Sequence, residues 1–190
     1  SGQTQVPKLR AAMKSLKLAR LEPDLATDGV IIKAKREKRE YEELYRKHIN
    51  IIESPSADFD IYKLTRQIDE ECVYINDFEN PGNWGKRNEN ERSYCVSLIS
   101  RIEDVLSAPE LSCIFRIDGK RSILEEIEDF LSSSDKSVLR ISLKYVSFAY
   151  NAREVLANAL GRNMLSKARD GCFLEKPLLI FVDEAHNFLD

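Results

Sequence analysis

The feature that most constrains the fold is the stretch from residue 177 to residue 190, PLLIFVDEAHNFLD. Five consecutive large apolar residues, Leu178 to Val182, run directly into the acidic pair Asp183-Glu184. Such an uninterrupted apolar run is typical of a strand that is buried on both faces of a parallel sheet. The stretch therefore predicts a strand that carries two carboxylates to the sheet edge where open α/β sheets bind ligands.

A second strand and a long helix are predicted upstream of this run. Residues 137–146 alternate between apolar and polar side chains, which favours a strand. Residues 149–168 place apolar side chains at helical spacing. Strand, helix and strand in this order predict a βαβ crossover, whose two strands are parallel.

The residues before this unit are predicted to be mostly helical. Apolar stripes of helical period lie in five segments, 6–21, 31–52, 61–71, 91–107 and 123–131. Ser122 and Glu125 have the spacing of a capping box at the start of the last helix. Residues 113–117 favour a short strand that ends at Asp118-Gly119.

The acidic pair matches the Walker B element of P-loop NTPases. In that reading, Asp183 holds the water shell of Mg²⁺, and Glu184 takes a proton from the attacking water. His186 either senses the phosphate state or simply begins the next helix. The alternative is a buried strand that ends in a polar turn with two solvated acids. The phosphate-binding loop Gly-x-x-x-x-Gly-Lys-Ser/Thr is absent from these 190 residues, so the chain alone is not expected to bind ATP tightly or to hydrolyse it.

Three segments together resemble the HerA/FtsK group of hexameric P-loop ATPases, and the HerA-like branch most closely. They are residues 137–143, 152–160 and 177–188, and the resemblance covers residues 137–189 well and 91–190 loosely. It implies an α/β fold: a partial P-loop NTPase core with parallel strands at 132–190, preceded by a mostly α-helical insertion at 1–131. It also implies a homo-hexamer that moves double-stranded DNA, uses ATP and Mg²⁺, and works with a nuclease or another effector.

Two other functions fit parts of the sequence. The tetrapeptide Asp183-Glu184-Ala185-His186 also names a group of helicases that unwind RNA or DNA. A non-enzymatic helical adaptor, in which the terminal acids are incidental, is the third possibility.

The composition of the chain does not decide between these three functions. The formal net charge of -3 argues neither for nor against nucleic acid. The basic run at 33–39 is interleaved with Glu37 and Glu40, so it is either a solvated helix face or a DNA contact. Trp84 either stacks on a base or a partner, or pins its loop to the surface. The arginines that could stabilise transition-state charge in a neighbouring subunit are Arg153, Arg162 and Arg169.

Cysteine and histidine usage bears on metal binding and on location. The four cysteines form no C-x-x-C pair and the chain has only two histidines, which argues against a structural zinc site. Cys95 and Cys113 are expected to be buried, and His48 is expected to pack in a core. With no secretory signal and no apolar run long enough to span a membrane, the expected location is a reducing cytoplasm.

Overall fold

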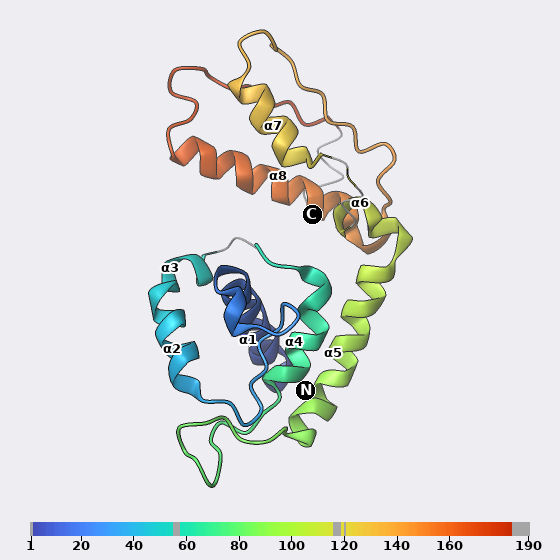
Figure 1. Cartoon of the computed structure of the whole chain (residues 1–190). Helices are drawn as coiled ribbons and strands as arrows, with labels where there is room; N and C mark the ends of the chain where they lie inside the picture. Colours follow the sequence, from blue (N-terminus) through green and yellow to red (C-terminus); the bar gives the residue numbers. More distant parts are fainter. Residues whose placement is uncertain (1, 55–57, 116–118, 120, 184–190) are drawn as a thin grey trace. The chain divides into compact units, whose positions relative to one another are not determined.

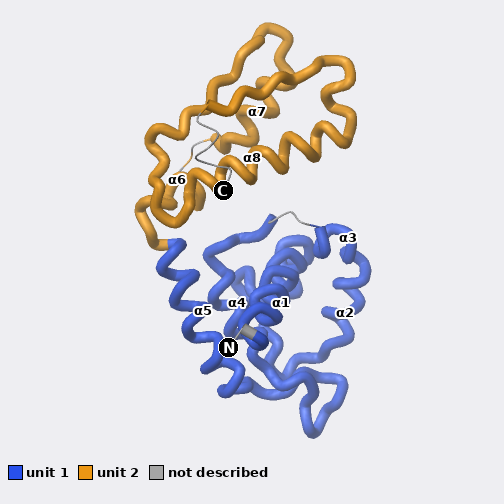
Figure 2. The backbone as a smooth tube through the Cα atoms, turned by 180° about the vertical axis from the view of Figure 1, so that it is seen from behind, with its two compact units in different colours: residues 1–106 blue, residues 107–190 orange. Residues whose placement is uncertain are grey.

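The computed structural model describes residues 2–54, 58–115, 119 and 121–183, and it divides into two compact units, residues 1–106 and 107–190 (Figure 2). Unit 1 contains α1 (Gly2–Leu21), α2 (Lys38–Lys47), α3 (Ile49–Ile52), α4 (Leu64–Glu71) and α5 (Glu89–Ser107), whose last residue belongs to unit 2 (Figure 1). Unit 2 contains α6 (Ser112–Phe115), α7 (Ile123–Ser132) and α8 (Ala152–Arg169). The predicted boundary after residue 131, between an insertion and an ATPase core, stays a prediction.

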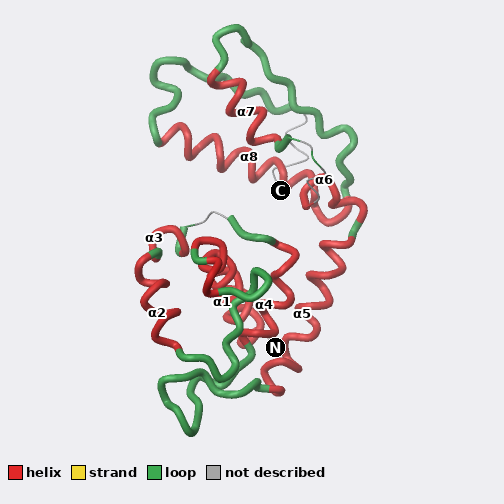
Figure 3. Tube along the Cα trace, in the orientation of Figure 1, coloured by secondary structure: helices red, strands yellow, loops and turns green. Residues whose placement is uncertain are grey.

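The predicted α/β class is wrong for the part of the chain that the structure describes. Helices account for 60% of the residues, and the described residues form three isolated bridges but no sheet (Figure 3). Residues 137–146 and 178–182 have irregular backbones, so the parallel βαβ core predicted from them is absent. A strand needs a neighbour for its backbone N–H and C=O groups, and neither segment has one among the described residues.

The core of unit 1 forms where α1 packs against α4. The amphipathic sequence of α1 buries Ala12 and Leu16 against Leu64 and Ile68 of α4, and Cys95 of α5 joins the same cluster. A second cluster lies further along α1 and joins it to the following turn and to α3; its members are Leu18, Ala19, Leu25, Ile31 and Ile52. These two clusters fix α1, α3, α4 and α5 as one body.

The segment 31–52 is not the single helix that its stripe predicts. Its first residues are irregular, Lys35 has a positive φ of 63°, and α2 begins only at Lys38. A break at His48 then separates α2 from α3. The helical pattern misleads here because Ile31 and Lys33 are both buried in unit 1.

The loop at residues 73–88 is held in a defined shape by backbone hydrogen bonds. The amides of Tyr74 and Gly85 donate to Lys86 O (3.1 Å) and Tyr74 O (2.8 Å), and the amide of Asp77 donates to Asn83 O (2.9 Å). A Cβ at Gly85 would lie 2.7 Å from Tyr74 Cβ, so this close crossing of the two loop arms requires glycine. The loop is therefore rigid at its base.

In unit 2 the two predicted helices are present as α7 and α8, but the predicted strands are absent from its described residues. The predicted capping box at the start of α7 is confirmed, because Ser122 Oγ accepts from the amide of Glu125 (3.1 Å) and Glu125 Oε2 accepts from the amide of Ser122 (2.8 Å). Cys113 lies in α6, so the strand predicted at 113–117 is wrong for its described residues. Ile127 and Phe130 of α7 and Ala152 of α8 are buried.

Candidate functional site

The described part of the predicted catalytic segment, residues 178–183, has an irregular backbone and is largely exposed. Asp183 is exposed, while Glu184 and His186 lie outside the described residues. The apolar side chains before it are also exposed, with accessible fractions of 76% for Leu179, 86% for Phe181 and 60% for Val182. Among the residues that the structure describes, no cluster of three or more acidic, histidine or cysteine side chains could hold a metal. The roles of Asp183 in Mg²⁺ binding and of Glu184 in water activation therefore stay predictions.

The candidate arginine fingers have different surroundings. Arg153 is engaged locally, because its guanidinium donates to Val146 O (2.7 Å) and Lys144 O (3.4 Å) and lies 3.6 Å from the centre of the Phe148 ring. Arg162 and Arg169 are exposed on α8. These contacts make Arg153 the least available of the three for a neighbouring subunit.

The most concentrated polar cluster in unit 1 surrounds Glu71, at the end of α4. One carboxylate oxygen accepts from Ser15 Oγ (2.6 Å) and Gln67 Nε2 (3.1 Å), and the other accepts from Lys33 Nζ (2.6 Å). Gln67 also bonds the backbone N–H of Ile31 (2.8 Å) and its C=O (3.1 Å). The cluster thus ties α1, α4 and the segment before α2 together.

Two aromatic rings close this cluster around the lysine. Lys33 Nζ lies 4.5 Å from the centre of the Tyr41 ring and 5.1 Å from that of Trp84. The two rings meet edge to face with centroids 5.2 Å apart. Trp84 therefore pins the 73–88 loop to α2, which is one of the two roles predicted for it.

Serine, lysine and glutamate in contact could suggest nucleophilic catalysis, but their burial excludes a substrate. Ser15 is 0% exposed, Lys33 6% and Glu71 5%. A general base or a nucleophile must reach its substrate directly or through one water molecule. The cluster is therefore a polar core, and sequence reasoning missed it because its members are far apart in the chain.

The basic run at 33–39 is mostly engaged with partners inside unit 1. Lys33 pairs with Glu71, Lys35 with the buried Asp77 (2.5 Å), and Arg39 with Glu43 (2.9 Å). Arg36 donates to Leu25 O, and Lys38 donates to Asn76 Oδ1 (2.6 Å). This segment therefore offers much less free positive charge than its sequence indicates.

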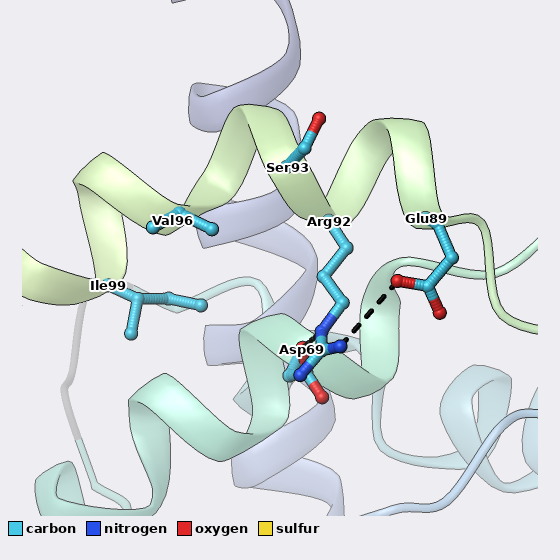
Figure 4. A pocket seen from close by; sticks show the side chains of 6 residues that line it. All are labelled: Asp69, Glu89, Arg92, Ser93, Val96 and Ile99. Atoms are coloured by element: carbon cyan, nitrogen blue, oxygen red, sulfur yellow. Dashed lines mark hydrogen bonds and ion pairs between the residues drawn. The ribbon is translucent and has the colours of Figure 1, made fainter.

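A shallow groove of about 350 Å³ runs between α4 and α5, and we call it the α4–α5 groove. At one end Arg92 bridges two carboxylates, with 2.6 Å from its Nε to Asp69 Oδ1 and 3.5 Å from its Nη1 to Glu89 Oε2. Val96 and Ile99 of α5 give the groove an apolar stretch beyond these charges (Figure 4). The remaining lining residue is Ser93.

The cysteines and histidine show no sign of a reactive or metal-binding centre among the described residues. All four thiols are free; Cys95 is buried as predicted, whereas Cys113 is exposed and that prediction is wrong. Burial, together with the neighbouring Cys95, raises the pKa of Cys72 to about 12, which keeps this thiol protonated and unreactive. His48 is half-buried and its Nε2 lies 2.7 Å from Glu22 Oε1.

In the part of the chain that the structure covers, no helix combines the length and the apolar character that crossing a membrane requires. Comparisons with protein-family models, with curated proteins and with solved structures find no match to this chain.

Proposed function

We propose that this chain contributes the acidic pair Asp183-Glu184 to an ATP-hydrolysing, DNA-translocating motor of the HerA type. The observation that carries the proposal is the run Leu178–Val182 followed directly by Asp183, Glu184, Ala185 and His186. The upstream segments 137–143 and 152–160, which resemble the same group, support it. The proposal concerns these side chains and does not depend on a sheet within the chain.

The chemistry divides the work between the two acids. Asp183 stays ionised and binds the water shell of Mg²⁺, and Glu184 accepts a proton from the water that attacks the γ-phosphate of ATP. His186 reports the phosphate state to the rest of the motor. The phosphate-binding loop must come from other polypeptide, because these 190 residues contain none.

The wider assignment rests on the same resemblance. The motor acts as a homo-hexamer on double-stranded DNA together with a nuclease or another effector. Its location is the cytoplasm, and the four free thiols support a reducing compartment.

The test compares ATP turnover and ATP binding in the intact gene product and in its Glu184→Gln variant. Removing the proton acceptor is expected to lower turnover by at least about 100-fold, because a general base contributes about 10²–10⁴-fold. Bound ATP should be retained, because the introduced glutamine keeps the size of the side chain and Asp183 keeps the metal. Glu175→Gln, which changes an exposed acid of the same unit, is the matched control and should leave turnover unchanged.

Normal turnover in the Glu184→Gln variant would remove Glu184 from the mechanism. An intact gene product that neither binds nor hydrolyses ATP would overturn the whole assignment. ATP hydrolysis by the 190-residue chain alone would equally contradict the proposal, since the chain lacks a phosphate-binding loop.

A non-enzymatic helical adaptor is the second candidate. The observation that favours it is the helical body of unit 1, which exposes Ile75 and Phe78 almost completely on a rigid loop. Such side chains are typical of binding surfaces. In this case the intact gene product would bind no ATP.

A further inference from the structure

Two of the four cysteines lie together in the core of unit 1. Cys72 follows the last residue of α4 and is 1% exposed, and Cys95 of α5 is 0% exposed. Both belong to the buried cluster that α1 and α4 share, and their thiols are in hydrogen-bond contact. The two side chains therefore point toward each other, which is the arrangement that a disulfide requires.

Contacts on either side of the pair hold α4 and α5 against each other. The amide of Asn88, one residue before α5, donates to the backbone oxygen of Cys72 (2.8 Å). Inside α5, the Nε of Arg92 lies 2.6 Å from Asp69 Oδ1 of α4 (Figure 4). Cys95 comes three residues after Arg92, so both side chains lie on the face of α5 that meets α4. A disulfide at this place would need little movement of the backbone.

While α5 is packed on α4, neither thiol can react. Disulfide exchange requires a thiolate that touches the disulfide it attacks. Burial, together with the neighbouring Cys95, raises the pKa of Cys72 to about 12, so this thiol stays protonated. Both side chains are also closed off from solvent. The pair can react only when α5 moves away from α4.

α5 is attached to unit 1 by few buried side chains. Its 19 residues all lie in the described part of the chain, and Cys95 is the buried one among them. Leu98, Ile99 and Ile102 pack against the same cluster but are only partly buried. A helix with so little buried apolar surface opens at a lower free energy than the whole unit unfolds. Opening exposes both thiols to water, where a cysteine with a pKa of about 8.5 is partly ionised.

We propose that Cys72 and Cys95 form a disulfide that locks α5 onto α4 when the chain meets a small-molecule disulfide such as oxidised glutathione. While α5 is open, the thiolate of one cysteine attacks the small disulfide, and a mixed disulfide forms as one small thiol leaves. The second cysteine thiolate then attacks the cysteine sulfur of the mixed disulfide and releases the other small thiol. Two cysteine thiols are oxidised, one small disulfide is reduced, and the two small thiols take up the two cysteine protons.

The disulfide makes unit 1 sensitive to redox conditions. In the reducing cytoplasm proposed for this chain both thiols stay free. Under oxidising conditions the covalent link closes residues 72–95 into a ring that contains the 73–88 loop, and it fixes one wall of the α4–α5 groove to the other. This inference concerns unit 1 and does not require ATPase activity.

The first experiment detects the disulfide by mass spectrometry. Cys113 and Cys172 are exposed, so replacing both by serine leaves only the buried pair in the full 190-residue chain. Equal amounts of ¹⁵N-labelled and unlabelled variant are mixed, incubated with oxidised glutathione, alkylated and digested with trypsin. The expected product joins the two tryptic peptides that contain the pair, residues 67–86 and 93–101, and both carry the same isotope. Glutathione attached separately to the two cysteines, or peptides joined between isotopes, would overturn the proposal.

The second experiment tests whether the opening of α5 controls the reaction. Hydrogen exchange of the α5 amides measures the opening, and the rate of disulfide formation is followed in parallel. Arg92→Gln removes the ion pair with Asp69 and leaves both thiols in place, so it should speed exchange and oxidation together by about 2- to 5-fold, the effect of a partly exposed ion pair. Arg39→Gln, which removes the exposed pair with Glu43 on α2, is the matched control and should change neither rate.

The outcomes of this test are distinct. α5 amides that exchange while both thiols stay free would overturn the proposal, as would oxidation that occurs only in the globally unfolded chain. In the unmodified chain the exposed Cys113 and Cys172 should react with glutathione faster than the buried pair. A pair that reacts as fast as these two cysteines would show that opening does not limit the reaction.

The third measurement tests the lock itself. In urea unfolding followed by Trp84 fluorescence, the oxidised chain should have an unfolding equilibrium constant about 30- to 1,000-fold lower than the reduced chain, the usual range for a disulfide. Its α5 amides should exchange more slowly, and a reducing phosphine should reverse both effects. An oxidised chain that is no more stable than the reduced one would contradict a lock. None of these outcomes depends on ATP, so they are separate from the test of Glu184.

Discussion

Removing the charge of Lys33 should destabilise unit 1 more than removing any exposed lysine. The side chains of Lys33 and Glu71 are only 7% and 5% exposed, and their charged atoms are 2.6 Å apart. In Lys33→Met the carboxylate of Glu71 stays buried with the neutral donors Ser15 and Gln67 but without a cation. Breaking a buried ion pair from one side costs about 3–5 kcal/mol of unfolding free energy.

Removing both charges should cost less than the two single changes added together. In Lys33→Met/Glu71→Met no unpaired charge remains, and apolar replacements of buried ion pairs are often nearly neutral. The double variant also removes one acceptor from Ser15 Oγ and Gln67 Nε2, but Ser15 Oγ keeps Tyr41 Oη (3.1 Å) and Gln67 Nε2 keeps Ile31 O (3.1 Å). Each loss is therefore smaller than the cost of about 1–3 kcal/mol for a buried group that is left with no partner. We therefore expect a coupling free energy of roughly 2 kcal/mol or more between Lys33 and Glu71.

The assay is urea unfolding followed by tryptophan fluorescence. Trp84 is the only tryptophan in the chain, and its ring centre lies 5.1 Å from Lys33 Nζ, so the signal reports on unit 1. Lys14→Met is the matched control, because Lys14 also bonds a glutamate, Glu53, at 2.6 Å but in an exposed pair. A loss below about 1 kcal/mol for Lys33→Met, the value of a surface pair, or a loss equal to that of the control, would refute this account of the cluster.

Three further predictions test other parts of the structure. Gly85→Ala should cost about 1–3 kcal/mol in the same unfolding assay, because the new Cβ would lie 2.8 Å from the backbone oxygen of Asn76. The hydrogen bond from Lys35 is the main reason why the pKa of Asp77 lies below its ordinary value of 3.8. The lower pKa belongs to the folded state, so this contribution to stability is complete above the ordinary value and is lost as the pH falls through the lowered one. The difference in stability between the unmodified chain and Asp77→Asn should therefore shrink between about pH 6 and pH 2. Ser122→Ala should lower the stability of α7 by about 1 kcal/mol and speed hydrogen exchange of the amide at the third position of that helix.

Local sequence signals predicted the helices well where one face of a helix packs against a core. The helix expected at 91–107 is α5, and the helix expected at 123–131 is α7, which also begins with its predicted capping box. These signals are local, because helical period and capping depend on residues three or four positions apart. The same reasoning failed at 31–52, where burial of Ile31 and Lys33 by distant segments decides the backbone.

The predicted strands failed for a different reason. A continuous apolar run such as Leu178–Val182 indicates that the segment favours burial, but it does not supply the neighbouring strand that a sheet requires. Within the described residues no such neighbour is present, and the side chains of this run remain largely exposed. The Glu71 cluster was unpredictable for a related reason, since Ser15, Lys33 and Glu71 come together only in the tertiary structure.

The pairing of the basic run also limits how this surface could evolve. If a mutation caused Lys33 or Lys35 to bind a new anionic ligand, the buried carboxylate of Glu71 or Asp77 would lose its cation. A gain in phosphate affinity at this segment would therefore lower the free energy of unfolding of unit 1. Selection for such affinity should act sooner on other cations, such as Arg162 and Arg169 of α8. Both are exposed, and neither pairs with a buried acid among the residues that the structure describes.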